Sequence, residues 1–177
     1  KVSYSPNVPT IKEAIVNAGW NGEVKLNPYT GIATFAITEF TPLDTKVVFD
    51  KQVDNAKIVF LGKEYDMTSS NGTTFTFDGN KLGKWTSYGE QLLYVKYKRG
   101  DVEVTVPLMN IIVLIDPSGY VFEGSMDNRL AGVQAVVEVK DTDGEWVAWE
   151  AEKFGQVNPQ ITNNEGSYGW DVIQGEW

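Results

Sequence analysis

The last third of the chain, residues 130–177, has the pattern that most constrains the fold. A β-branched, apolar run at Leu130–Val139 is followed by a polar, glycine-containing turn at 162–167, an aromatic strand that begins at Tyr168 and a second turn at 174–175. Short β-branched or aromatic segments separated by glycine and asparagine turns are typical of antiparallel strands. We therefore expect this part of the chain to form an antiparallel β-sandwich.

Short strands are also expected in the first two thirds of the chain. Asn-Gly, Asp-Gly and Arg-Gly-Asp turns separate the candidate segments, as in the hairpins of an all-β sandwich. The expected strands are 23–26, 32–40, 46–49, 57–61, 73–77, 92–98, 102–106 and 108–115. The last of these is almost entirely apolar, which indicates a buried strand. Together they predict an Ig-like sandwich.

One short helix is expected near residues 10–18. The sequence from Thr10 to Glu13 matches a capping box, and apolar residues recur after it at helical spacing. Gly19 is a suitable residue for the C-terminal cap. A helix of this length is too short to be stable alone, so we expect it to pack against a sheet.

The net charge is distributed unevenly along the chain. Residues 1–110 contain 12 basic and 12 acidic side chains, whereas residues 111–177 contain 3 basic and 12 acidic ones, so the second part accounts for the whole net charge of −9. This asymmetry predicts two domains, 1–115 and 116–177. Neither has the basic surplus that nucleic-acid binding requires. No run of about 20 apolar residues is present to span a membrane.

Cysteine and histidine are both absent from the sequence. The chain therefore has no disulfide, no thiolate metal site and no cysteine nucleophile. It also lacks the commonest general base and the usual ligand of transition metals. Phosphate-binding loops and nucleophile elbows are absent as well. These absences predict a protein that is not an enzyme, with no catalytic residue and no cofactor.

The order of segments near the end of the chain resembles a known family. A Leu-Ala-Gly-Val strand at 130–133 precedes Thr-Asn-Asn-Glu-Gly-Ser-Tyr-Gly-Trp at 162–170 and a final Gly-Glu-Trp at 175–177. Over residues 130–177 only, this order resembles the carboxypeptidase-regulatory-like and CnaB-type modules of bacterial surface proteins. The resemblance implies a transthyretin-like second sandwich that acts as a spacer, a stalk or a binding unit, in an extracellular protein of Gram-positive type.

The resemblance also implies that the second sandwich is incomplete. Modules of this kind continue past the final aromatic residue, whereas this chain stops at Trp177. A missing strand would leave an open sheet edge along Tyr168, Trp170 and Val172, with unpaired backbone donors and acceptors. We expect this edge to pair with a strand from a neighbouring domain or from another copy of the chain.

The aromatic residues give the strongest indication of a ligand. Six tryptophans and eight tyrosines are present, and flat rings on an exposed face can stack against sugars. The candidate carbohydrate-binding residues are Trp20, Trp85, Tyr88 and Trp146. The competing interpretation is that tryptophan and tyrosine fill the core, and we favour it for Trp149 and Trp170.

A calcium site is a weaker candidate at the Asp-Gly turn near residue 144. Asp141, Asp143 and Glu145 would be its ligands, but the glycine comes too early for an EF-hand loop. A hairpin turn accounts for the same sequence. We therefore prefer the turn and keep calcium as the alternative.

These features favour a non-catalytic structural or adhesion module of a larger protein of the bacterial cell surface. Its expected partners are neighbouring domains of the parent protein or copies of itself, without nucleic acid and without a membrane span. The alternative is a carbohydrate-binding module attached to a polysaccharide-degrading enzyme. A glycosidase fragment that uses a carboxylate pair such as Glu150 and Glu152 is the third and least favoured interpretation.

Overall fold

The computed structural model describes residues 8–26, 31–38, 41–83 and 88–177. The predicted all-β class is confirmed, because the described residues form strands joined by turns and three short 3-10 segments. These segments are η1 (Gly19–Asn21), η2 (Gly79–Leu82) and η3 (Ala151–Phe154). Within the described ranges, no helix has the length and apolar character needed to cross a membrane.

The chain divides into two compact units, Lys1–Val113 and Leu114–Trp177. The division comes two residues before the boundary that the charge asymmetry suggested after residue 115. Each unit has its own cluster of buried apolar side chains. The two units are therefore described one at a time.

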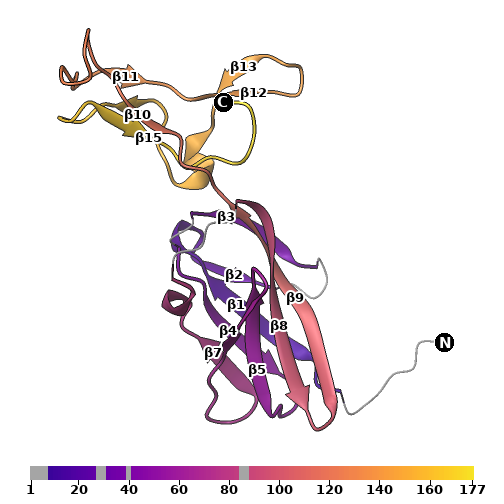
Figure 1. Ribbon diagram of the computed structural model, residues 1–177. Helices are drawn as coiled ribbons and strands as arrows, with labels where there is room; N and C mark the ends of the chain where they lie inside the picture. The colour runs from indigo at the N-terminus through magenta and orange to yellow at the C-terminus, as the bar shows by residue number, and fades with distance from the viewer. Residues whose placement is uncertain (1–7, 27–30, 39–40, 84–87) are drawn as a thin grey trace. The chain divides into compact units, whose positions relative to one another are not determined.

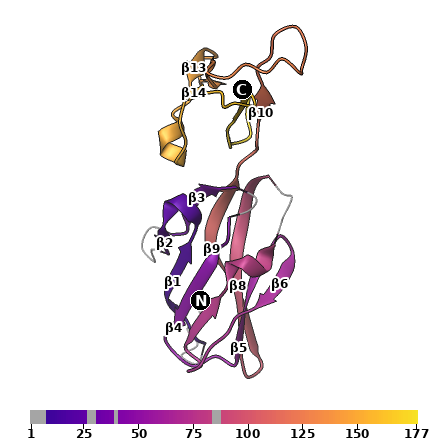
Figure 2. The ribbon, with the colours of Figure 1, turned by 90° about the vertical axis from the view of Figure 1, so that its left-hand side faces the viewer.

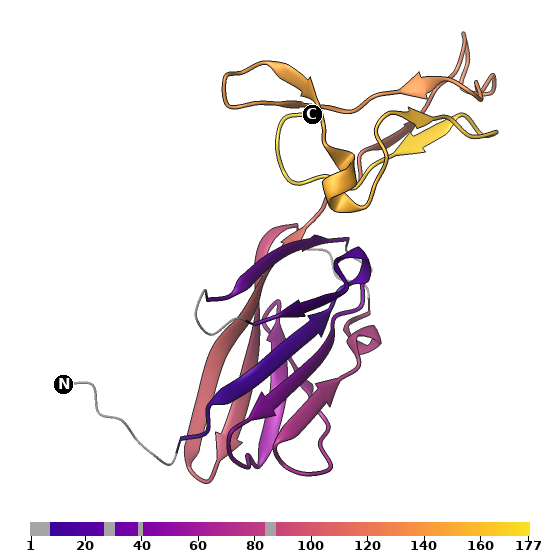
Figure 3. The same ribbon diagram turned by 180° about the vertical axis from the view of Figure 1, so that it is seen from behind.

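The first unit contains two sheets, which lie in two layers in Figures 1 and 3. The four-stranded sheet has the order β2 (Glu23–Lys25), β1 (Ile11–Asn17), β4 (Asp44–Phe49) and β7 (Thr74–Phe77). The five-stranded sheet has the order β3 (Ala33–Ile37), β9 (Val102–Val113), β8 (Gly89–Arg99), β5 (Asn55–Phe60) and β6 (Lys63–Asp66).

Alternating apolar residues build the core of this unit. In β5, Ala56, Ile58 and Phe60 are buried, while the residues between them are partly exposed. Strand β4 shows the same alternation, with Val47 and Phe49 buried. Because successive side chains of a strand point to opposite faces, each sheet presents one apolar face to the shared core. The result is a β-sandwich-like unit.

The helix predicted near residues 10–18 is wrong, because these residues form strand β1 instead. Ala14 and Val16 are fully buried and Ala18 continues the same alternation, while β1 pairs with both β2 and β4. A capping box and a helical apolar spacing contribute little over two turns. The hydrogen bonds that β1 forms on both of its edges outweigh these local helix signals. The local sequence does not indicate that two partner strands are present.

Strand β3 also departs from the expected antiparallel arrangement. It pairs in parallel with β9, from Ala33 opposite Met109 to Ile37 opposite Val113, whereas the other strand pairs are antiparallel. The chain leaves the four-stranded sheet after β2 and joins the edge of the other sheet, as Figure 2 shows. Strand direction therefore depends on this crossover, and the residues of β3 do not encode it.

Strand β9, which forms the longest hairpin with β8, combines two segments that the sequence suggested as separate strands, 102–106 and most of 108–115. Strand β9 runs through Pro107, and the register shifts opposite Leu93 and Tyr94. Proline has no N–H for the ladder, and a bulge accommodates it. At the turn, Gly100 has a φ of 58°, a left-handed conformation that glycine adopts at little cost.

The second unit has much shorter strands, in three separate two-stranded sheets. They are β10 (Ser118–Tyr120) with β15 (Ser167–Gly169), β11 (Gln134–Ala135) with β14 (Gln160–Ile161), and β12 (Glu138–Lys140) with β13 (Trp146–Ala148). The larger sheets of a sandwich are not seen in residues 114–177, all of which are described. The buried cluster of this unit contains Val137, Trp149, Ala151, Trp170 and Val172.

Replacing Val95 with alanine should lower the free energy of unfolding of the first unit by roughly 2 kcal/mol, because a buried side chain is truncated and leaves a cavity. Val95 has an exposed fraction of 0%. Val102→Ala is the matched control, since Val102 is 44% exposed in the same sheet, and a change within about 0.5 kcal/mol is expected there. Urea unfolding followed by circular dichroism measures both. Equal losses would contradict the described core.

Candidate functional site

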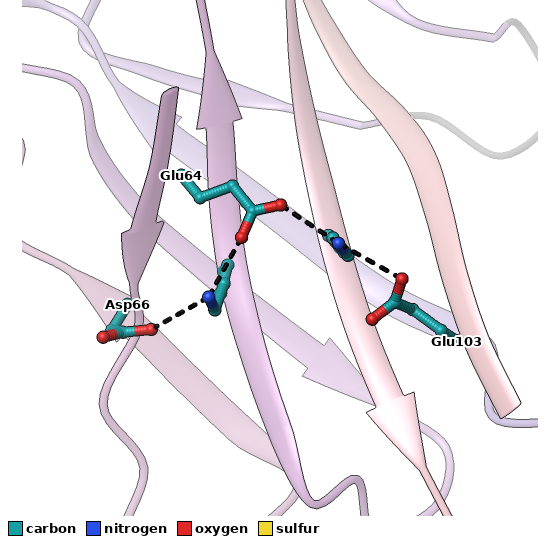
Figure 4. A network of polar contacts seen from close by, with 5 residues as sticks. Glu64, Asp66 and Glu103 are labelled. Carbon is teal, nitrogen blue, oxygen red and sulfur yellow. Dashed lines mark hydrogen bonds and ion pairs between the residues drawn. The ribbon is translucent and has the colours of Figure 1, made fainter. Parts of the chain in front are cut away.

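The first candidate site is a network of charges on the five-stranded sheet, shown in Figure 4. The Nζ atom of Lys57 lies 2.9 Å from Glu64 Oε2 and 3.8 Å from Asp66 Oδ1. The Nζ atom of Lys96 lies 3.0 Å from Glu64 Oε1 and 3.1 Å from Glu103 Oε1. Strands β5, β6, β8 and β9 each contribute to this network.

The network keeps its groups in their ordinary charged forms. Hydrogen bonds from Lys57 and Lys96 lower the pKa of the Glu64 carboxyl. The hydrogen bond to Glu64 in turn raises the pKa of Lys57, and the same carboxylate followed by Glu103 raises that of Lys96. A general acid requires a raised carboxyl pKa and a general base requires one near neutrality. The pKa shift of Glu64 is therefore opposite in direction to that of a general acid.

Three other carboxyl groups of the first unit also have lowered pKa values. The hydrogen bond from Lys46 is the largest cause for Glu13, the backbone N–H of Thr10 for Asp50, and the side chain of Asn80 for Asp78. Each of these groups is ionised more readily than an isolated carboxyl group. None of them has the raised pKa that marks a catalytic acid.

The second candidate site is a groove of about 510 Å³ in the second unit. Four aromatic side chains contribute to its wall, together with two valines and few polar groups. The lining residues are Pro117, Ser118, Val136, Val137, Glu138, Trp146, Tyr168, Trp170 and Trp177. A concave, mostly apolar surface with a small number of polar groups is the usual form of a ligand site. We call this surface the aromatic groove.

The β12–β13 hairpin positions one wall of the aromatic groove. Trp146 is directly opposite Lys140, and Glu138 is opposite Ala148. Because residues two apart on a strand share a face, Glu138, Lys140 and Trp146 lie on the same face of the hairpin. Trp146 is 50% exposed, so its ring is accessible to a ligand.

The other aromatic rings of the groove are held by specific contacts. Trp170, which is 4% exposed, donates from Nε1 to the carbonyl oxygen of Val157 at 2.8 Å. Trp177 donates from Nε1 to the carbonyl oxygen of Ile173 at 2.8 Å. The ring of Trp177 also packs edge-on against Trp149, with centroids 5.4 Å apart. Fixed indoles lose little conformational entropy when a ligand binds.

The backbone that positions Tyr168 and Trp170 is paired on one side with residues 115–120, which include β10. The N–H of Trp170 donates to the carbonyl oxygen of Pro117 at 3.0 Å, and Val172 exchanges two hydrogen bonds with Ile115. Tyr168 is opposite Gly119 in the β10–β15 ladder. These contacts account for one side of the strand, so the open edge expected along Tyr168, Trp170 and Val172 stays a prediction for its other side.

Two glutamine side chains occupy the opposite edge of the same strand. The amide of Gln160 donates to the carbonyl oxygen of Gly169 at 2.6 Å and accepts from its N–H at 3.1 Å. The amide of Gln156 does the same with Asp171, at 2.7 Å in each direction. A glutamine amide has both a donor and an acceptor, so it can replace one residue of a missing strand. The sequence pattern gave no indication of this arrangement.

Three of the four aromatic residues predicted to bind carbohydrate are described, and they belong to two different units. Trp20 is 41% exposed in η1 and Tyr88 is 49% exposed next to β8, and both belong to the first unit. Trp85 lies outside the described residues. Of the three that are described, Trp146 lines the aromatic groove.

Sequence reasoning missed Tyr168 and Trp177 as lining residues of the groove, and it assigned Trp170 to the core. Trp149 and Trp170 are buried, as that assignment expected. Trp170 nevertheless also contributes to the groove. The alternation of Tyr168 and Trp170 across a glycine was the available signal, because residues two apart on a strand share a face.

The predicted calcium ligands are used in a turn. Asp141 Oδ1 accepts from the backbone N–H groups of Asp143 and Glu145, each at 2.9 Å. Within the described part of the chain, no group of three or more acidic side chains is close enough to hold a metal ion. Asp141, Asp143 and Glu145 are therefore not brought together as a metal site, and the hairpin turn accounts for their spacing.

No known family model, curated protein or solved structure matches the chain. The likeness of residues 130–177 to CnaB-type modules therefore stays a prediction.

Replacing Glu64 with glutamine should make the free energy of unfolding of the first unit less dependent on pH at acidic pH. Because the folded state lowers the pKa of Glu64, its charge stabilises the fold above the ordinary pKa of glutamate, and this contribution is lost as the pH falls through the lowered value. Thermal unfolding against pH should show a small deficit at neutral pH that disappears in acid and in high salt. Glu23→Gln, on β2, is the control. A deficit that grows on acidification would contradict the network.

Replacing Gln160 with glutamate should destabilise the second unit by about 1–3 kcal/mol, because a carboxylate cannot donate to the carbonyl oxygen of Gly169. Gln134→Glu is the matched control, since it makes the same change at an exposed position of the same unit. Urea unfolding gives the free energies, and hydrogen exchange at Gly169 reports on the local edge. Equal effects of both variants would show that added charge alone is responsible.

Proposed function

We propose that the chain is a non-catalytic carbohydrate-binding module of a larger extracellular protein. The observation that carries this proposal is the aromatic groove, in which a half-exposed Trp146 stands beside rings held by hydrogen bonds. Flat, rigid rings provide a large contact area for the apolar faces of a sugar at small entropic cost. Ser118 and Glu138 in the lining can orient the hydroxyl groups of the ligand.

The proposal that the chain is not an enzyme is supported by its composition and its titration. Histidine and cysteine are absent, and the shifted carboxyl pKa values among the described residues are lowered. In the carboxylate pair of the glycosidase interpretation, Glu150 forms an ion pair with Lys153. Binding by the aromatic groove needs neither a metal nor a cofactor.

For the finer fold, we propose an Ig-like first unit and a CnaB-type, transthyretin-like second unit. The two sheets around one core support the first assignment. The order of segments over residues 130–177 supports the second. An origin on the bacterial cell surface, or in a secreted protein attached to a polysaccharide-degrading enzyme, fits this likeness and the absence of cysteine.

A structural or adhesive role through strand pairing is the second candidate function. Strands β3 and β6 bound the five-stranded sheet, and an edge strand can accept a strand from a neighbouring domain or from another copy. In the second unit, the glutamine amides occupy the edge at Gly169 and Asp171. The strand pairing proposed here therefore uses the first unit.

Replacing Trp146 with alanine should weaken polysaccharide binding by about tenfold or more, because a central aromatic contact is lost. Trp20→Ala is the matched control, since Trp20 is a similarly exposed tryptophan of the other unit. Pull-down with insoluble cellulose and chitin, followed by calorimetry with soluble oligosaccharides, measures the effect. Failure to bind any polysaccharide, or a loss caused by Trp20→Ala alone, would contradict the proposal.

A further inference from the structure

A single carboxylate lies in the wall of the aromatic groove. Glu138 is exposed, and it is a diagonal neighbour of Trp146 on the β12–β13 hairpin, because Trp146 is opposite Lys140 and Glu138 is opposite Ala148. Diagonal neighbours on one face of an antiparallel pair are about 7–8 Å apart, within reach of a long aromatic side chain. A ligand stacked on Trp146 therefore comes close to a negative charge.

The three basic residues of the second unit are already engaged within it. Lys140 Nζ lies 2.9 Å from Glu176 Oε2, and Lys153 forms an ion pair with Glu150. The guanidinium of Arg129 lies 3.7 Å from the ring centroid of Tyr120. None of the three lines the groove of this fully described unit. A negatively charged ligand would find no free cation there.

An ammonium group of the same hairpin lies near the Trp146 ring. Lys140 Nζ lies 5.9 Å from the centroid of the Trp146 ring, a distance at which a cation is attracted to the ring. Lys140 and Glu138 are two apart on β12, so their side chains lie on the same face of the hairpin. The hairpin thus has a carboxylate and an aromatic ring on one face, and both groups attract an ammonium ligand. Lys140 itself is paired with Glu176.

The charge of the whole unit has the same sign as that of Glu138. Residues 114–177 contain the 12 acidic and 3 basic side chains of the second part of the chain, a net charge of −9. A field of one sign attracts ligands of the opposite charge and repels those of the same charge. Uronic acids and sulfated sugars are therefore disfavoured, and neutral sugars gain nothing from the field.

We propose that the aromatic groove selects glycans with protonated amino groups, such as oligomers of glucosamine. The sugar ring stacks on Trp146, and the ammonium group pairs with the carboxylate of Glu138. This inference rests on the proposed carbohydrate-binding function, and it specifies the chemical class of the ligand.

The test compares three oligosaccharides of equal length: a glucosamine oligomer, its N-acetylated form and a glucuronic acid oligomer. Calorimetry is done at slightly acidic pH and low salt, where the amino groups are protonated. We expect the glucosamine oligomer to bind about tenfold more tightly than the N-acetylated one, with no binding of the uronic acid. This preference should decrease as salt is added.

Glu138→Gln should remove the preference, because it should weaken the glucosamine oligomer about tenfold and the N-acetylated oligomer much less. Glu145→Gln is the matched control, because it removes the same charge from the hairpin turn, outside the groove lining. The control variant should keep the preference. Circular dichroism checks that both variants are folded.

The outcomes separate this inference from the function on which it rests. Equal binding of the amino and N-acetylated oligomers, or tighter binding of the N-acetylated one, would overturn the selectivity and leave carbohydrate binding intact. Equal losses in Glu138→Gln and Glu145→Gln would show attraction by net charge and overturn the role of Glu138. Binding of none of the three oligomers would count against both.

Discussion

The backbone of residues 167–172 must find hydrogen-bond partners on both of its edges, and the second unit is arranged around this requirement. A buried N–H or carbonyl group without a partner is costly. Residues 115–120 supply the hydrogen-bond partners on one edge, and the side-chain amides of Gln156 and Gln160 supply some of those on the other edge. This pairing fixes the strand that holds Tyr168 and Trp170, and with it the floor of the aromatic groove.

The first unit meets the same requirement by a different route. Its strands are long enough to form two sheets, so most of the backbone is paired within ladders and the apolar faces enclose one core. The charges of Lys57, Glu64 and Lys96 then lie on the outside of a sheet that is already complete. In this unit the hydrophobic core provides the main stability, and the exposed ion pairs add little.

The features that support the proposed function are concentrated in the unit with the least regular structure. Its short strands leave room for a groove, and its few basic residues are used internally, so that Glu138 gives the groove its charge. Aromatic rings held by side-chain to backbone hydrogen bonds can bind a ligand without reorganisation. A small unit with little core can therefore still present a defined site.

The sequence by itself determined the all-β class, the burial of Trp149 and Trp170, and the concentration of negative charge after residue 110, because alternation, residue type and charge are local properties. It did not determine strand β1 or the parallel pairing of β3, since both depend on partners far along the chain. The aromatic groove likewise required the tertiary structure. Trp146 and Trp177 line the same groove only when β12, β13 and the last residues fold together. A local sequence pattern does not indicate which distant side chains will share a surface.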